Sequence, residues 1–175
     1  MMNHLMLDIE TMSTQNSAAM LQIAAVEFDI LTGETGKEFN VNVNLQSCLD
    51  CGLTMEASTV MWWMQQSDEA RKSLIKTNPL HLKDALIEFS KFCTKEYEVW
   101  GNSARFDCGI LQNAYNVCGM EIPWDFRKER CVRTLLSFNP SAKKETPFVG
   151  NPHNAIDDCK HQIAYCSAIW AKMNK

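Results

Sequence analysis

The 175-residue sequence lacks any apolar run close to the roughly 20 residues that a transmembrane helix needs. It also lacks a basic segment followed by an apolar stretch at its start, where residues 1–4 read Met-Met-Asn-His. The first absence argues against a membrane-spanning helix and against a membrane as partner, and the second argues against a secretion signal. Together they predict a soluble, cytoplasmic protein of a bacterium or a phage-infected cell.

Internal repeats, low-complexity tracts and linker-like segments are missing as well. A chain of this length without them is expected to form one domain over residues 1–175. Apolar residues make up 46% of the chain and charged residues 22%, which suffices for a hydrophobic core and argues against intrinsic disorder.

Cysteine is present eight times, but this is too sparse for the disulfide framework of a small secreted domain. Cys48 and Cys51 form one Cys-x-x-Cys pair, and no second pair follows at zinc-finger spacing. A structural zinc would need two further ligands from scattered positions. We therefore favour reduced thiols that pack as small hydrophobic groups.

An excess of basic residues is also absent: 17 Lys and Arg stand against 21 Asp and Glu, for a net charge of −4. Nucleic-acid-binding proteins usually present a basic surface. The charge balance therefore argues against such a partner, unless bound metal ions offset a local group of acids.

The amino-terminal part has the pattern of three successive strands. Residues 4–10 are typical of a buried strand that ends in two acids, and residues 20–29 of a second strand. After a turn at 32–36, apolar residues alternate with polar ones from Phe39 to Leu45, which predicts a third strand. The short turns indicate an antiparallel meander.

Helical periodicity dominates the rest of the chain. Residues 58–76 are expected to form a helical region, broken where Ser67 caps its second half, and a further helix is expected to begin at Asn78 and Pro79. A strand over 98–101 and a helix that ends before Gly119 should follow. The remaining expected elements are a strand or helix start over 130–134, a polar loop over 143–152 and a last helix from Asn154. This order predicts a mixed α/β domain with helices packed on a sheet.

Polar residues with catalytic potential stand at the ends of these elements, where functional sites are often found. Asp8 and Glu10 are two apart on a strand, so their side chains share one face. Asp107 opens the helix after a short strand, and Asp158 lies in the first turns of the last helix, five residues after His153. Each acid alone is typical of a solvated surface, but the combination is much rarer by chance.

Three motifs containing these residues resemble those of the DEDD exonucleases, the DnaQ-like proofreading and RNA-trimming enzymes. They are Asp-Ile-Glu-Thr at 8–11, Trp-Gly-Asn-Ser-Ala-Arg-Phe-Asp at 100–107 and His-Asn-Ala-Ile-Asp-Asp at 153–158. A histidine five residues before the last aspartate is typical of the DEDDh branch. The resemblance spans the whole chain and implies an RNase H-like α/β fold. That fold has a mixed five-stranded sheet, with three antiparallel strands followed by two parallel ones, flanked by helices.

A narrower resemblance links the chain to a phage and bacterial subgroup of 3′–5′ exoribonuclease or exodeoxyribonuclease VIII-like proteins. It lies in residues 59–67 (Thr-Val-Met-Trp-Trp-Met-Gln-Gln-Ser), residues 69–71 and residues 131–135. Proofreading enzymes usually have Asp where Arg133 stands and Thr-Gly at positions 12–13, which weakens an assignment to polymerase proofreading.

The resemblance implies hydrolysis of phosphodiester bonds with two divalent cations, Mg²⁺ or Mn²⁺, which prefer oxygen ligands. Asp8 would bridge the two ions, Glu10 and Asp158 would complete the ion that activates water, and Asp107 would hold the other. His153 would be the general base, because imidazole titrates near neutral pH. The products would be 5′-mononucleotides. Two dications would offset the four acids, and the rest of the chain is neutral.

Residues beside these motifs are candidates for binding single-stranded DNA or RNA 3′ ends. Adjacent tryptophans can stack on a base, or one of them can belong to the core. The candidates are Thr11, Met12, Asn102, Phe106, Trp62 and Trp63. The basic run from Arg127 to Arg133 fits a phosphate track and a solvated face equally well.

Three other functions remain open: an RNase H-type endonuclease, a catalytically inactive nucleic-acid-binding domain, and an α/β domain whose acids hold a structural metal. The position of His153 favours the exonuclease over the endonuclease, and the complete set of acids argues against an inactive domain. The sequence does not decide between DNA and RNA. A Trp- and Met-rich helix and the dimers of the family make a homodimer possible.

Overall fold

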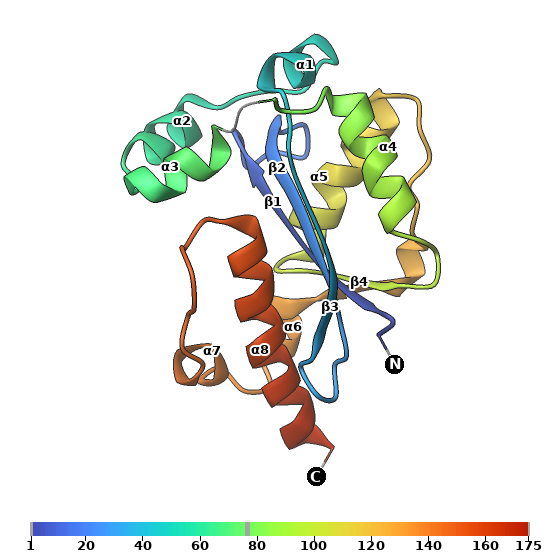
Figure 1. Ribbon diagram of the computed structural model, residues 1–175, viewed down its shortest axis with the longest axis vertical. Helices are drawn as coiled ribbons and strands as arrows, with labels where there is room; N and C mark the ends of the chain where they lie inside the picture. The colour runs from blue at the N-terminus through green and yellow to red at the C-terminus, as the bar shows by residue number, and fades with distance from the viewer. Residues whose placement is uncertain (1, 76–77, 175) are drawn as a thin grey trace.

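The computed structural model, described here for residues 2–75 and 78–174, has a five-stranded sheet at its centre (Figure 1). The strands are β1 His4–Thr11, β2 Met20–Phe28, β3 Thr35–Asn42, β4 Glu98–Gly101 and β5 Glu129–Cys131. Their order across the sheet is β3-β2-β1-β4-β5. β2 is antiparallel to β1 and β3, whereas β4 is parallel to both β1 and β5. The predicted fold class is therefore confirmed.

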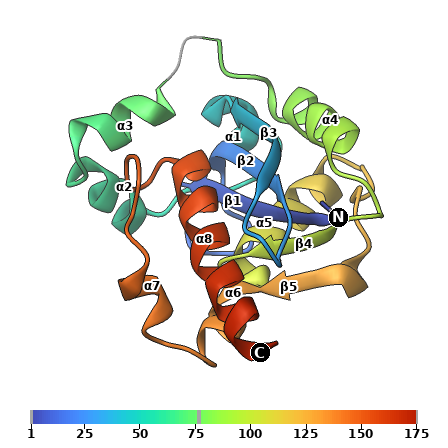
Figure 2. The same cartoon turned by 60° about the horizontal axis from the view of Figure 1, so that its bottom comes forward.

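Helices cover both faces of this sheet, which explains why β1 and β2 are buried along most of their length. α4 Leu82–Phe92 and α5 Ala104–Val117 enclose one core, and α6 Val132–Leu136 and α8 Ala155–Met173 enclose the other. Figures 1 and 2 show α8 running along the sheet on its own side, with α4 and α5 on the opposite side.

The described residues also contain four further α-helices and a short 3-10 helix: α1 Leu45–Asp50, α2 Ala57–Met64, α3 Asp68–Leu74, α7 Ala142–Glu145 and the 3-10 helix Phe126–Lys128. α2 and α3 stand near the carboxyl end of β1 (Figure 1). None of the helices among the described residues combines the length and the apolar character that crossing a membrane requires.

Three predicted boundaries were wrong. The third strand begins at Thr35, inside the predicted turn at 32–36, rather than at Phe39. Leu45 does not end the third strand; it begins α1, because the side chain of Asn44 caps that helix by accepting a hydrogen bond from the backbone N–H of Ser47. Asn78 does not cap α4 either. Asn78 has a left-handed φ of 66°, and His81 is the residue that caps the helix.

Other local predictions agree with the structure. Ser67 caps α3, which ends at Leu74, so the predicted helical region stops before position 76, which lies outside the described residues. Gly119, with a φ of 68°, follows the end of α5. Residues 130–134 contain both predicted elements, because β5 passes directly into α6. The expected loop over 143–152 differs in that it opens within the short helix α7. All eight cysteines are unpaired, as predicted.

Candidate active site

The three sequence motifs meet in one cavity at the carboxyl ends of β1 and β4. The cavity has a volume of about 290 Å³, and its lining includes all five residues singled out as catalytic candidates: Asp8, Glu10, Asp107, His153 and Asp158. Three elements separated by about 50 residues of sequence or more thus contribute to a single site, as expected for the ends of adjacent parallel strands and the helix packed beside them.

Alternation along β1 determines which way its two acids point. Leu7 and Ile9 belong to the core beneath α4 and α5, whereas Met6 belongs to the core beneath α8. Asp8 and Glu10 share the face of Met6, because side chains two apart on a strand point the same way. Both carboxylates therefore lie on the α8 side, where Glu10 is only 9% exposed.

Helix α8 also holds Asp8 in place. The side-chain amide of Gln162 donates a hydrogen bond from Nε2 to Asp8 Oδ1 at 2.9 Å. Gln162 lies one helical turn after Asp158, so the two residues share a face of α8 that points into the cavity. This residue was missed in the sequence, although its spacing of four from Asp158 is a signal that could have identified it.

Asp107 enters the site because β4 ends in a glycine. A Cβ atom on Gly101 would lie 2.8 Å from Asp107 Oδ2 and 2.9 Å from Asp107 Cβ, so only glycine leaves room for this side chain. The carboxylate turns back to the start of α5, where the backbone N–H of Ser103 donates to Oδ2 at 3.2 Å. Asp107 is 2% exposed.

A tight loop before α8 presents the histidine. The backbone N–H of Asn151 donates to Asp157 Oδ2 at 2.9 Å, and Gly150, with a φ of 107°, leaves space for that carboxylate. His153 itself has a φ of 64°, a left-handed conformation uncommon for histidine. Asn154 then caps the helix. Asp157 therefore orders the loop that carries the histidine.

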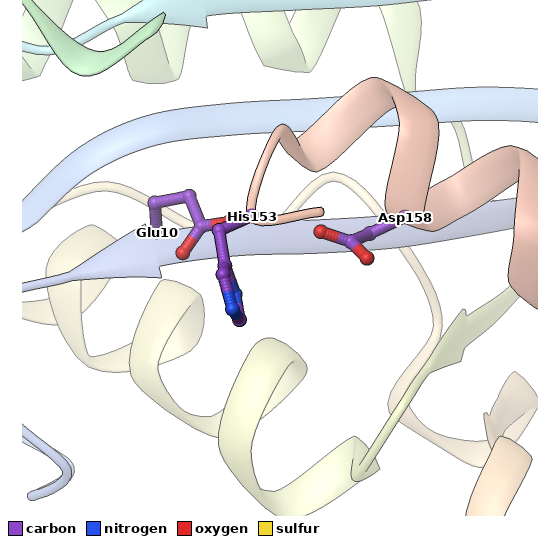
Figure 3. Close-up of side chains that lie close together, drawn as sticks. All are labelled: Glu10, His153 and Asp158. Atoms are coloured by element: carbon purple, nitrogen blue, oxygen red, sulfur yellow. The ribbon is translucent and has the colours of Figure 1, made fainter. Parts of the chain in front are cut away.

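Glu10, His153 and Asp158 form a compact group (Figure 3). One potential ligand atom of each lies within 4.8 Å of those of the other two. Figure 3 shows Glu10 on the strand, His153 on the loop before α8, and the Asp158 carboxylate directed toward both. Two carboxylates and an imidazole at this separation are a suitable donor set for a divalent cation.

The cavity strongly disfavours negative charge. Burial raises the pKa of Asp8 well above its usual range, and repulsion from Asp107, Glu10 and Asp158 raises it further, against the lowering effect of the Gln162 hydrogen bond. Burial and repulsion likewise raise the pKa of Glu10. Burial raises the pKa of Asp107 to about 7 and also raises that of Asp158. A nearby cation would reverse these shifts.

A second, mostly apolar cleft of about 410 Å³ adjoins the acidic cavity. Its lining includes Thr11, Trp62, Trp63 and Phe106. Trp63 is 6% exposed and donates from Nε1 to the carbonyl oxygen of Thr11 at 2.9 Å, whereas Trp62 is 42% exposed. The ring of Trp62 also lies edge-on to that of His153, with centroids 5.0 Å apart. One tryptophan is thus largely buried, yet both reach the cleft.

The remaining predicted binding residues differ in position. Asn102 lines the acidic cavity, and Phe106 lines both the cavity and the cleft. Met12 lines neither of them. Its backbone accepts a hydrogen bond from Glu56 N–H at 2.8 Å and donates one to Ala19 O at 2.9 Å, so it ties the turn after β1 to neighbouring segments.

The predicted basic run does not form one surface. Arg127 pairs with Asp125 at 3.7 Å, and Arg130 donates to Glu98 at 3.0 Å, near the end of the molecule where β5 begins. Arg133, in contrast, lines the acidic cavity. The solvated-face interpretation therefore fits the first two residues, and Arg133 has a different environment.

Comparisons with known proteins agree with this architecture. Residues 3–170 match the model of the 3′-5′ exoribonuclease Rv2179c-like domain. None of the curated protein sequences matches the chain significantly. Among solved structures, the zinc-bound Escherichia coli exonuclease I–ssDNA complex superimposes with a TM-score of 0.72 at 16% identity, covering 98% of this chain and 41% of that one.

Two further structures are similar in fold. Exonuclease I from Methylocaldum szegediense gives a TM-score of 0.60 at 15% identity, covering 98% of this chain and 41% of that one. Cell-death related nuclease 4 gives 0.50 at 15% identity, with coverages of 97% and 62%. The chain spans about two-fifths of the exonuclease I structures. These likenesses show the RNase H-like fold, and the match over residues 3–170 shows that the chain belongs to the 3′-5′ exoribonuclease Rv2179c-like domain family.

Proposed function

We propose that this protein is a metal-dependent exonuclease that removes nucleotides one at a time from the 3′ end of single-stranded RNA. The observation that carries the proposal is the convergence of Asp8, Glu10, Asp107, His153 and Asp158 in one cavity. The exoribonuclease family model favours RNA over DNA. Support for a single strand comes from exonuclease I, which has been solved with single-stranded DNA.

The side chains of the cavity suit divalent metal ions. Most of its donors are carboxylate oxygens, the ligands that Mg²⁺ and Mn²⁺ prefer. Four acids with raised pKa values, of which Glu10 and Asp107 are buried and the other two half-buried, need positive charge to be ionised together at neutral pH. The buried Oε1 of Gln162 has no hydrogen-bond partner among the described residues, so an acceptor beside the site is also free.

The four acids would share the work of holding two ions. Asp8 is repelled by Asp107, Glu10 and Asp158 alike, so we assign it as the bridging carboxylate. Glu10 and Asp158 would complete one ion and Asp107 the other. When bound, the ions supply a nucleophilic hydroxide and offset the charge that develops on the phosphate oxygens.

His153 would take the proton of the attacking water. Its ring lies among the ligand atoms of Glu10 and Asp158, and the loop ordered by Asp157 fixes its backbone. The edge-on contact with Trp62 limits where the imidazole can turn. Lys143 lines the same cavity and brings a positive charge close to the position of the scissile phosphate.

The apolar cleft would hold the terminal base. Trp62 and Trp63 offer ring surfaces on one side of the shared residue Phe106, and the acidic cavity lies on the other side. Stacking of a base on an aromatic side chain contributes about 1–3 kcal/mol without choosing between bases. This arrangement fits removal of nucleotides irrespective of sequence.

The test uses 5′-labelled single-stranded RNA and DNA of one sequence with the purified protein in Mg²⁺ or Mn²⁺. We expect shortening from the 3′ end in single-nucleotide steps, faster on RNA and stopped by chelator. Asp158→Asn should abolish turnover, and His153→Asn should slow it by about 10²–10⁴-fold. His81→Asn, which alters an exposed residue on α4's amino-terminal side, is the matched control.

Three results would contradict the proposal. Internal cleavage of a duplex would indicate an RNase H-type endonuclease. Undiminished turnover by the Asp158 variant would exclude the metal arrangement. Absence of hydrolysis by the wild-type protein, with metal binding demonstrated, would indicate a binding domain without catalytic activity.

A further inference from the structure

A polar groove continues from the acidic cavity along the start of α5. Its volume is about 550 Å³, and its lining includes Arg105, Arg133, Gln15 and Asn16. Phe106, together with Arg133, lines both the groove and the acidic cavity, so the two spaces are continuous. The groove leaves the cavity on a different course from the apolar cleft, whose lining includes neither arginine.

The two arginines of the groove differ from the other three in the chain. Arg71, Arg127 and Arg130 each pair with an Asp or Glu side chain. For Arg105 and Arg133, by contrast, the described part of the chain supplies neither an ion-pair partner nor a side-chain hydrogen bond. Both are exposed. Two guanidinium groups that form no ion pair among the described residues therefore line one groove of an acidic protein, and Arg133 lies near enough to Asp107 to lower the pKa of that carboxyl.

The chemistry of the groove matches an anionic chain. A guanidinium group offers several N–H donors in a planar fork, which suits phosphate oxygens. The side-chain amides of Gln15 and Asn16 add neutral donors and acceptors without adding charge. Carboxylates are absent from the described lining of the groove, in contrast with the cavity that it adjoins.

We propose that Arg105 and Arg133 bind the phosphodiester groups of the substrate strand on the 5′ side of the bond that is cut. The terminal base would lie in the apolar cleft, the scissile phosphate over the acids, and the preceding backbone in the groove. Arg133 stands at the junction and Arg105 farther along. This proposal rests on the proposed function, since it takes the acidic cavity as the place of cleavage.

Substrate length provides the decisive variable. A dinucleotide has only the scissile phosphate, whereas an octanucleotide also has phosphates that reach the groove. We expect Arg105→Gln to raise the KM of a single-stranded RNA octamer about tenfold, because the variant loses one hydrogen bond to a charged group. The KM of the dinucleotide should change much less. Arg105→Lys should restore part of the loss, and Arg127→Gln should have no effect on either length.

Direct binding separates this proposal from the proposed function. Affinities for fluorescent RNA octamer and dinucleotide are measured in Mg²⁺ on the Asp158→Asn background. For the octamer, the slope of log Kd against the logarithm of the salt concentration should be smaller by about 0.7 in Arg105→Gln than in the parent protein. This is the contribution of one phosphate contact on a single strand.

Equal losses for both lengths, or an unchanged salt dependence, would overturn the assignment of the groove. Loss of octamer binding by Arg105→Gln together with an inactive wild-type protein would leave the groove assigned but refute the exonuclease. Normal trimming with unaltered binding by Arg105→Gln and Arg133→Gln would refute the groove and leave the exonuclease intact.

Discussion

Removing divalent metal should make the stability of this protein fall as the pH rises. Burial raises the pKa of Asp107 from 3.8 to about 7, and burial with mutual repulsion raises the pKa values of Asp8 and Glu10. Between pH 4 and 7 the folded protein therefore binds more protons than the unfolded chain. By the linkage relation, the contribution of these protons to the free energy of unfolding is fully present below pH 4 and is lost as the pH rises through 7.

The magnitude follows from Asp107 alone. A pKa change from 3.8 to about 7 corresponds to about 4 kcal/mol of unfolding free energy at 1.36 kcal/mol per pH unit. That is a large part of the roughly 5–15 kcal/mol by which a domain is stable. Metal at 100 times its Kd would return about 2.7 kcal/mol, and more at higher concentration.

The assay is urea unfolding at pH 5, 6, 7 and 8, in chelator and in Mg²⁺. We expect the free energy of unfolding in chelator to decrease over this range, with most of the loss between pH 5 and 7, and Mg²⁺ to restore it above pH 7. Asp107→Asn should flatten the decrease in chelator. Glu121→Gln, which removes an exposed carboxylate outside the cavity, should leave it unchanged. Stability in chelator that is constant or rises from pH 5 to 8 would refute the reasoning.

Two supporting contacts give further predictions. Gly101→Ala would place a methyl group 2.8 Å from Asp107 Oδ2. It should destabilise the fold by about 1–3 kcal/mol and lower kcat, and normal values of both in unfolding and trimming assays would contradict this. Gln162→Met removes the donor to Asp8 and should weaken metal binding by about 10–100-fold in a calorimetric titration. An unchanged metal affinity would show that the amide does not orient this carboxylate.

Strand alternation predicted the first three strands and the shared face of the two acids of β1, whereas the full five-stranded sheet was predicted from the resemblance to the DEDD exonucleases. The pattern Leu-Met-Leu-Asp-Ile-Glu places both acids of β1 on one face whatever packs against them, and Asp107 and Asp158 stand at recognisable element starts. The catalytic roles of these residues and the homodimer stay predictions.

What the sequence did not predict depends on contacts across the fold. The amide of Gln162 finds Asp8 only because α8 lies along β1, and Gly101 is required only because Asp107 turns back against it. The error at Leu45 has a similar cause. Leu45 is apolar and so continues the alternation of β3. The side chain of Asn44, however, accepts a hydrogen bond from the backbone N–H of Ser47, and a helix begins there instead.

The hydrogen bond between Gln162 and Asp8 joins positions 154 residues apart in the chain. A nascent polypeptide that has emerged only as far as β5 contains Asp8 and Asp107, yet the imidazole and the last carboxylate are still to be translated. At roughly 5–20 residues per second, the 27 residues from the end of β5 to Asp158 take about 1–5 s to add. During that interval the growing chain lacks two of the five residues that meet in the acidic cavity.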